Sequence, residues 1–308
     1  MEALALQTMP FLDLLAGVRT GWANTLFSAL TWLGDEITLL AVIIVFLWCV
    51  DKRKGFYIAT VSFTGMVANQ FLKLFCRVPR PWVLREDFQI VEAARGTAGD
   101  YSFPSGHTQA SVGIFAGIAH WTDKKWLRAV CIALAVIVPF SRMYLGVHTP
   151  LDIAAAAVVA LALVFALKPV FQRGDPNGIR CVLIAQAVLS ALALLLAAVL
   201  IRPEEMDPVN LNNSMKSLAT LCGASVGLVC SFEADVRWLH YDTRTAAWWG
   251  QALKLILGMV IVIALREGGK AVFGKSLVVY GVLHFVLVVF AGIVWPMTFK
   301  WFAKLGKK

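Results

Sequence analysis

Three short polar clusters interrupt a chain that is otherwise rich in apolar residues. They are KLFCRVPRP (73–81), PSGH (104–107) and SRMYLGVHTPLD (141–152). A charged side chain at membrane depth is expensive unless it is paired or serves a function, so these clusters are the first candidates for a functional site. Their side chains are of the types that bind an anion, attack phosphorus and move protons, which points to phosphate chemistry.

The cationic residues of the clusters suit a phosphate group. Arg80 and Arg142 each carry a planar guanidinium that binds phosphoryl oxygens through two parallel hydrogen bonds. Lys73 adds a compact point charge. We expect these three side chains to hold the phosphate of a substrate.

Two predicted helix starts accompany these cations. Ser105 is a good N-cap, and Gly106 lets backbone N–H groups approach an anion where the helix dipole is positive. Thr149 and Pro150 are likewise typical of the cap and the first turn of another helix. Two positive helix ends are therefore expected to face one pocket.

Two histidines are candidates for the chemical steps. His148 precedes Asp152 by four residues, a spacing that brings the side chains together if the chain turns helically between them. A carboxylate that accepts the Nδ1 proton leaves Nε2 free to attack phosphorus, and His107 is then available as general acid for the leaving oxygen. The expected reaction is a two-step displacement through a phosphohistidine.

Composition sets the surroundings of this chemistry. The 308 residues are 59% hydrophobic and 15% charged, with a mean hydropathy of +0.73. These values are typical of a polytopic membrane protein. Apolar runs near the length that crosses the hydrocarbon predict an all-α bundle of nine membrane spans. The expected spans are residues 35–50, 55–75, 105–121, 128–142, 150–171, 181–201, 217–236, 247–266 and 276–299.

Basic residues give the expected orientation. They collect in DKRK (51–54), TDKKWLR (122–128) and other loops of one side, which the positive-inside rule places in the cytoplasm. The three polar clusters then face the outside, with the amino end outside and the carboxyl end in the cytoplasm. Because the net charge of +9 is spread over separate loops, no nucleic-acid partner is expected.

The amino-terminal segment differs from the predicted spans. It carries Asp13, Arg19 and Trp22 among apolar residues, which predicts an amphipathic helix lying at the membrane interface. The amino end lacks a basic region followed by a small-residue cleavage site, so we expect no signal peptide.

Taken together, the three clusters resemble the complete signature of the type 2 phosphatidic acid phosphatase superfamily, which vanadium haloperoxidases share. The resemblance covers roughly residues 35–171. It implies that His148 is the nucleophile, that His107 protonates the leaving group and that Asp152 orients the nucleophile. It also implies a reaction without metal or cofactor, and a phosphate site made of Lys73, Arg80, Ser105, Gly106 and Arg142.

These expectations divide the chain into three parts of one integrated membrane domain. Residues 1–34 are the interfacial segment, residues 35–171 the phosphatase core and residues 172–308 a four-helix membrane extension. Nine spans with the amino end outside resemble the topology of glucose-6-phosphatases.

The expected function is hydrolysis of a lipid phosphate or polyprenyl diphosphate at the extracytoplasmic face, in a bacterial cytoplasmic membrane. A head group at the interface reaches a site built from outer helix ends while its tail stays in lipid. A sugar phosphatase similar to glucose-6-phosphatase is the main alternative. A lipid phosphate transferase and a transporter are the others, whereas a haloperoxidase is disfavoured because those enzymes are soluble.

Other polar features have structural interpretations. The loop of residues 81–102 is long enough to arch over the site and restrict access, although its charges equally suit a solvated surface. The six cysteines have no metal-ligand spacing and are interpreted as buried packing residues. His284 is expected to be a hydrogen-bonded packing residue, and Glu233 to form a salt link with Arg237.

Overall fold

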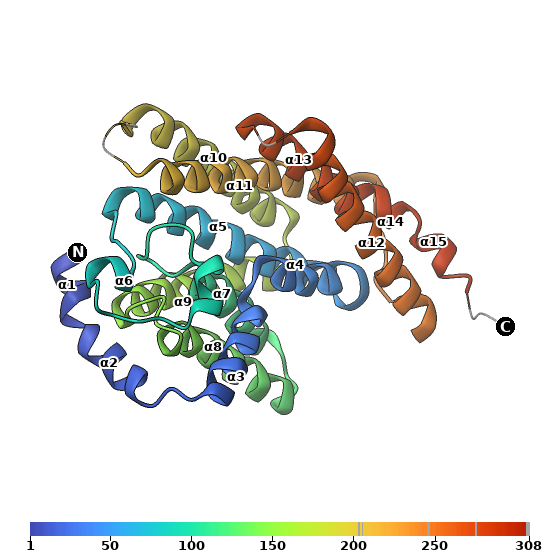
Figure 1. Ribbon diagram of the computed structural model, residues 1–308. Coiled ribbons are helices and arrows are strands. Elements are labelled where there is room, and N and C mark those ends of the chain that lie inside the picture. Colours follow the sequence, from blue (N-terminus) through green and yellow to red (C-terminus); the bar gives the residue numbers. More distant parts are fainter. Residues whose placement is uncertain (203, 205, 245–246, 275, 306–308) are drawn as a thin grey trace. The chain divides into compact units, whose positions relative to one another are not determined.

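The chain folds into α-helices joined by short loops (Figure 1). The structure is a computed structural model that describes residues 1–308 except 203, 205, 245–246, 275 and 306–308. Within these residues no β-strand is present, so the all-α prediction is confirmed. The chain forms two compact units, which we describe separately. Unit 1 comprises residues 1–39, 64–168 and 196–214, and unit 2 comprises residues 40–63, 169–195 and 215–308.

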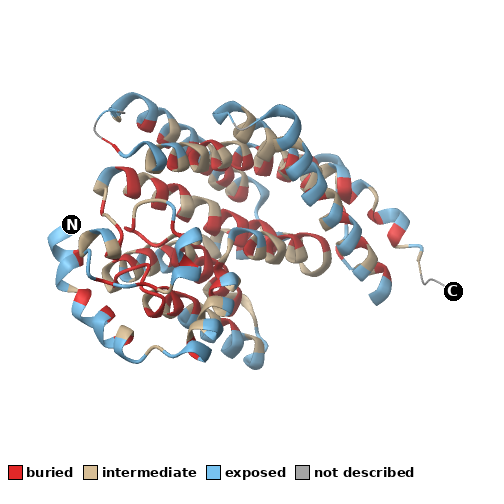
Figure 2. Ribbon diagram, in the orientation of Figure 1, coloured by how far each residue is buried: buried red, intermediate tan, exposed pale blue. Residues whose placement is uncertain are grey.

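The helices that carry the polar clusters lie in unit 1 or reach into it. They are α5 (Lys52–Cys76), α6 (Pro81–Leu84), α7 (Gly106–Trp121), α8 (Lys125–Tyr144) and α9 (Pro150–Arg173). α7 packs along α8, and most of its side chains are buried. Buried residues, red in Figure 2, also fill the loops that lead into α7 and α9. The clusters are thus attached to buried parts of this unit.

The amino-terminal segment forms three short helices instead of the single interfacial helix that we predicted. They are α1 (Glu2–Gln7), α2 (Met9–Gly17) and α3 (Gly21–Thr31), followed by a 3₁₀ turn, η1 (Trp32–Gly34). On α2, Met9, Leu12 and Leu15 point inward at helical spacing and pack against Val147 and its neighbours. Its outward face is also apolar, with Leu14 65% exposed. The interfacial position of this segment stays a prediction.

The amino-terminal segment supports the turn between α8 and α9 through hydrogen bonds from Arg19. Arg19, between α2 and α3, donates from Nε to the carbonyl oxygen of Tyr144 at 2.9 Å and from Nη1 to that of Gln89 at 2.6 Å. Gly146 follows with φ of 80°, the left-handed region that glycine adopts readily. A Cβ at this glycine would lie 2.7 Å from Nη2 of Arg19. The turn after α8 therefore needs both the glycine and the arginine beside it.

The remaining helices belong to unit 2 or connect it to unit 1. They are α4 (Glu36–Val45) with η2 (Phe46–Val50), α10 (Pro176–Leu200), α11 (Pro208–Ala234) with η5 (Asp235–Leu239), α12 (Trp248–Phe273), α13 (Leu277–Val289) with η6 (Phe290–Val294), α14 (Trp295–Met297) and α15 (Phe299–Phe302). A further 3₁₀ turn in unit 1 is η3 (Glu92–Thr97).

Two side-chain predictions in unit 2 are confirmed. Nε of Arg237 donates to Glu233 at 2.9 Å, and Arg180 also contacts this carboxylate. Nδ1 of His284 lies 2.8 Å from the carbonyl oxygen of Tyr280, one turn earlier in α13. These groups satisfy one another locally, which is the usual arrangement for polar side chains in apolar helices.

The prediction of nine membrane spans is wrong in number for the part of the chain described. Six helices are long and apolar enough to cross a membrane, and the bent pair 21–34 and 36–50 makes a seventh if it counts as one span. α5 and α7 form as predicted, but neither is both long and apolar enough to count as a membrane span. α7 has only 16 residues, fewer than the roughly 20 that a span needs, and α5 carries polar residues such as Asn69 and Gln70 within its apolar stretch, which lower its mean hydropathy.

The cysteines are free, as expected, but most of them are not buried. Cys131 is buried, Cys181 is exposed, and the other four are half-buried. Apolar side chains of a membrane protein do not need to avoid its surface, because that surface faces lipid. The interpretation of all six as core residues is therefore corrected.

Candidate active site

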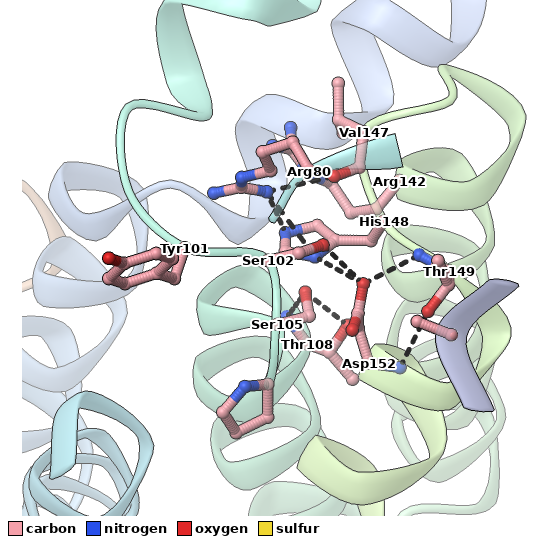
Figure 3. A network of polar contacts seen from close by, with 12 residues as sticks. Arg80, Tyr101, Ser102, Ser105, Thr108, Arg142, Val147, His148, Thr149 and Asp152 are labelled. Atoms are coloured by element: carbon pink, nitrogen blue, oxygen red, sulfur yellow. Dashed lines mark hydrogen bonds and ion pairs between the residues drawn. The ribbon is translucent and has the colours of Figure 1, made fainter. Parts of the chain in front are cut away.

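The three polar clusters meet in unit 1 at the ends of five helices, α5 to α9 (Figure 3). Lys73 is in the last turn of α5, Arg80 caps α6, and Arg142 is in the last turn of α8. These three residues and Ser105, His148 and Asp152 are all at least 95% buried. A group of cations so well removed from solvent needs anionic or acceptor partners.

His148 and Asp152 form the pair that their spacing predicted. Nδ1 of His148 lies 3.3 Å from Oδ2 of Asp152. The same oxygen accepts hydrogen bonds from Oγ of Ser102 at 2.6 Å and from the backbone N–H of Thr149 at 2.7 Å. Three donors therefore fix one carboxylate oxygen, and this oxygen fixes the imidazole ring.

Arg80 approaches the other ring nitrogen of His148. Its Nη1 lies 2.9 Å from Nε2 of His148 and also donates to the carbonyl oxygen of Val147 at 2.9 Å. Because a guanidinium only donates, Nε2 must offer a lone pair, and the ring proton must then be on Nδ1, facing Asp152. This is the tautomer in which Nε2 is able to attack phosphorus.

Asp100 bridges two of the three cations, Arg80 and Lys73. Its Oδ1 accepts a hydrogen bond from Nη2 of Arg80 at 2.7 Å and lies 3.3 Å from Nζ of Lys73. Its carbonyl oxygen accepts a further bond from Nε of Arg80 at 2.7 Å. Lys73 also donates to the carbonyl oxygen of Tyr101. One carboxylate, which the motifs did not indicate, thus bridges two of the predicted phosphate ligands.

Arg142 is held by two threonines from distant segments. Its Nη1 donates to Oγ1 of Thr31 at 2.9 Å and to Oγ1 of Thr97 at 3.0 Å, and its Nη2 donates to the Thr97 carbonyl oxygen at 3.3 Å. Figure 3 places Arg142 beside Arg80 and His148. These neutral acceptors leave the charge of the guanidinium uncompensated, and its buried Nε has no hydrogen-bond partner within the described residues, so it stays available to an anion.

The two helix starts are tied to each other. The backbone N–H of Ser105 donates to the carbonyl oxygen of Asp152 at 3.1 Å. Oγ of Ser105 caps α7 by accepting from the backbone N–H of Thr108 at 3.3 Å, and Oγ1 of Thr149 accepts from the N–H of Asp152 at 3.3 Å. Both predicted caps are confirmed. Gly106, the first residue of α7, is half-buried behind its cap.

His107 is half-buried in the first turn of α7. Its ring lies beside Gly34, where an added Cβ would be 3.4 Å from Cδ2 of the histidine. The charges of Arg142 and Arg80 act on this imidazole, and it acts in turn on His148. The structure therefore places His107 within electrostatic reach of the cluster, while the direct hydrogen bonds join Arg80, His148 and Asp152.

The local charges bias the protonation of three groups outside the membrane-spanning helices. Burial, together with the charges of Arg80 and Arg142, holds the pKa of His148 well below its ordinary value. Burial also lowers the pKa of the Arg80 guanidinium, which Asp100 partly opposes. Burial alone would raise the pKa of Asp100, but Lys73 and Arg80 outweigh it and keep that pKa below its ordinary value. The resting site therefore combines a neutral His148 with a charged Asp100.

Sequence reasoning missed four side chains of this site: Thr31, Thr97, Asp100 and Ser102. The last two lie within five residues of the PSGH cluster, so their proximity was available as a signal. No comparable signal marks the two threonines, which are 111 and 45 residues from Arg142. In the described part of the chain, no group of three or more His, Cys, Asp or Glu residues is arranged to hold a metal ion. The metal-free mechanism stays a prediction.

Sequence comparison assigns the chain that carries this site to a known family. A model described as the PAP2 superfamily matches residues 54–175, and one described as the transmembrane extension of PAP2 superfamily phosphatases matches residues 216–308. The chain belongs to the PAP2 superfamily. The first match contains all three polar clusters, so the resemblance inferred from them is confirmed. By family the chain is a membrane lipid phosphatase, and the PAP2 extension accounts for most of unit 2.

Three relatives illustrate the range of the PAP2 match. Phosphatidylglycerophosphatase B of Bacillus subtilis is 26% identical over 165 residues, which are 49% of this chain and 76% of the relative. An undecaprenyl-diphosphatase of Sulfolobus acidocaldarius is 32% identical over 133 residues, 43% of this chain and 63% of its own length. Sphingosine-1-phosphate phosphatase 1 of Mus musculus is 23% identical over 261 residues, 79% of this chain and 58% of its own length. The chain thus spans less than two thirds of the last two relatives.

Proposed function

We propose that this PAP2 protein hydrolyses the terminal phosphate of a lipid phosphate or polyprenyl diphosphate through a phosphohistidine on His148. The hydrogen-bond chain from Arg80 through His148 to Asp152 is the observation that carries this proposal. It combines an oriented nucleophile with a cation that can bind the group under attack.

The first step transfers the phosphoryl group to the enzyme. The lone pair on Nε2 of His148 forms a bond to phosphorus as the bond from phosphorus to the leaving oxygen breaks. His107, in the protonated form that a bound phosphate dianion favours, gives its proton to that oxygen. Asp152 stabilises the positive charge that develops on the attacking ring. The products are a free lipid alcohol, or lipid monophosphate, and phosphohistidine.

The second step returns the enzyme to its resting state. Neutral His107 takes a proton from water, whose oxygen bonds to phosphorus while the bond from phosphorus to Nε2 breaks. Lys73, Arg80 and Arg142 stabilise the equatorial oxygens in both steps, since phosphoryl transfer depends mainly on positioning and electrostatics. Inorganic phosphate then leaves.

Two observations favour a lipid as the substrate. The relatives are named for phosphatidylglycerophosphate, undecaprenyl diphosphate and sphingosine 1-phosphate. The site lies at helix ends of a chain with six or seven candidate spans, where a head group can arrive while its tail remains in the bilayer. We place this site at the extracytoplasmic face of a bacterial cytoplasmic membrane because the basic loops favour that orientation.

A phosphate-release panel on the purified protein in detergent tests the proposal. The panel compares phosphatidylglycerophosphate, phosphatidate, undecaprenyl diphosphate, sphingosine 1-phosphate and lipid A phosphate with glucose 6-phosphate. We expect release from at least one lipid and a much lower kcat/KM for the sugar phosphate. A preference for glucose 6-phosphate would support the sugar-phosphatase alternative and reject the lipid assignment.

Four controls separate the mechanism from its alternatives. H148A is expected to keep its fold and lose turnover, whereas a transporter would still move its substrate. Vanadate, which resembles the transition state of phosphoryl transfer, is expected to inhibit, and a metal chelator is expected to have no effect. Strong loss of activity on chelation would contradict the metal-free mechanism. Product analysis in the presence of alcohol acceptors distinguishes hydrolysis from transfer.

A further inference from the structure

Asp100 occupies an unusual place among the predicted phosphate ligands. Its Oδ1 accepts a hydrogen bond from Arg80 at 2.7 Å and lies 3.3 Å from Nζ of Lys73. Both cations are at least 95% buried, whereas 23% of the Asp100 side chain is exposed. The carboxylate therefore lies on the more open side of the two cations.

The contacts of this carboxylate are those that a phosphoryl oxygen would make. A phosphate bound by Arg80 and Lys73 needs the same guanidinium and ammonium donors that Asp100 now uses. The other contacts of Arg80 are to Asp100 and Val147 carbonyl oxygens and to Nε2 of His148. Of these partners, only the side chain of Asp100 carries a charge of the same sign as phosphate.

We propose that Asp100 is a displaceable counter-ion, which uses the hydrogen-bond donors that a phosphoryl group needs and thereby weakens the binding of the inorganic phosphate product. This inference rests on the proposed function, because it assumes that Lys73 and Arg80 bind a phosphoryl group. The low pKa of Asp100 keeps it charged in the absence of substrate.

The physical reason lies in the difference between substrate and product. The carboxylate competes with both anions, since two like charges cannot share the same donors without repulsion. A lipid substrate retains affinity because its apolar tail remains in the membrane. Inorganic phosphate has only its charge and hydrogen bonds, so Asp100 acts most strongly on its release.

A purely structural role for Asp100 predicts the opposite result. If the carboxylate only orients Lys73 and Arg80, then removing its charge disorders these side chains and weakens phosphate binding. If it competes with phosphate, then removing its charge strengthens phosphate binding. The sign of the change therefore distinguishes the two roles.

The test measures equilibrium binding of inorganic phosphate and of vanadate to the full-length protein in detergent, by calorimetry, for wild type, D100N, D100S and D100E. We expect both neutral variants to bind each anion about tenfold or more tightly, since charged hydrogen-bond partners are about twice as strong as neutral ones. D100E is expected to remain within about threefold of wild type, because it keeps the charge. E92Q is the matched control, since Glu92 is in the same loop but is paired with Arg95 and 71% exposed.

The outcomes separate this inference from the proposed function. Unchanged or weaker binding in the folded neutral variants, with binding intact in wild type, would overturn the counter-ion role alone. A wild-type protein that binds neither phosphate nor vanadate would overturn both. Thermal unfolding identifies which variants are folded, and two neutral replacements keep the test independent of either one. A tightening in E92Q equal to that in D100N would also overturn it, because the effect would then be one of net charge.

Discussion

Replacing Asp152 by asparagine isolates the contribution of its charge. Oδ2 of Asp152 accepts from Ser102, Thr149 and His148, whereas its Oδ1 has no hydrogen-bond partner within the described residues. Asparagine must therefore place its oxygen at the Oδ2 position to satisfy the three donors, and its NH₂ group at the Oδ1 position. The ring orientation and tautomer of His148 are then retained, but the negative charge is lost.

The expected size of the effect follows from the geometry. Two unit charges 3.3 Å apart, the distance between Nδ1 and Oδ2, interact by about 5 kcal/mol at an effective dielectric constant of about 20. If half of the positive charge has developed on the ring in the transition state, about 2.5 kcal/mol is lost, which lowers kcat about 70-fold. A full charge would lower kcat about 5,000-fold. We expect D152N to fall between these limits.

The first assay is steady-state phosphate release at saturating lipid. The second measures the amount of phosphohistidine after rapid mixing and quenching in base, in which phosphohistidine is stable. S102A is the matched control, because it removes the 2.6 Å bond to Oδ2 but leaves the carboxylate charged. We expect it to lower kcat less than about tenfold, the value of one hydrogen bond. A D152N enzyme with at least half the wild-type kcat, or an S102A enzyme as impaired as D152N, would refute the electrostatic role of Asp152.

Three further predictions concern the supports of the site. T31V removes one of the two hydroxyl acceptors of Arg142, so we expect kcat/KM to fall about tenfold with the fold intact; a change below twofold would contradict this support. The pKa of His148 is well below 6.5, so we expect protonation of His148 to abolish activity only as the pH falls through that low pKa. The measurement is the pH dependence of kcat/KM, corrected for ionisation of the substrate. An acid limb centred at or above pH 6.5 would disprove the assignment of His148 as the nucleophile. G146A forces a side chain into a backbone with φ of 80°, so the free energy of unfolding is expected to fall by at least about 1–2 kcal/mol, measured by chemical denaturation. G96A, where a Cβ meets no atom within 4 Å, is its control and is expected to change stability little.

The sequence was a reliable guide where function depends on local spacing. The four-residue interval from His148 to Asp152 predicted their contact, and Ser105 and Thr149 predicted the two helix caps. The partners of the cations were not predictable in this way. Arg142 finds Thr31 across 111 residues, and no periodicity relates the two positions.

The span count failed for a related physical reason. α5 and α7 carry parts of the site, and polar residues along α5, including Asn69 and Lys73, are buried inside the protein instead of facing lipid. Hydropathy rules assume that a spanning helix meets lipid, so they describe such helices poorly. The six helices that are long and apolar enough to span a membrane all begin at or after α8.

The hydrogen bond from Arg80 to Nε2 of His148 has a consequence for the idle enzyme. While it is in place, the ring nitrogen that would react with electrophiles is covered, and histidine reagents are expected to modify His148 slowly. If a phosphoryl group takes over the Arg80 donor, as the proposed mechanism requires, the same step releases the lone pair on Nε2. His148 is then expected to react more readily with a bound phosphate ester than with other electrophiles.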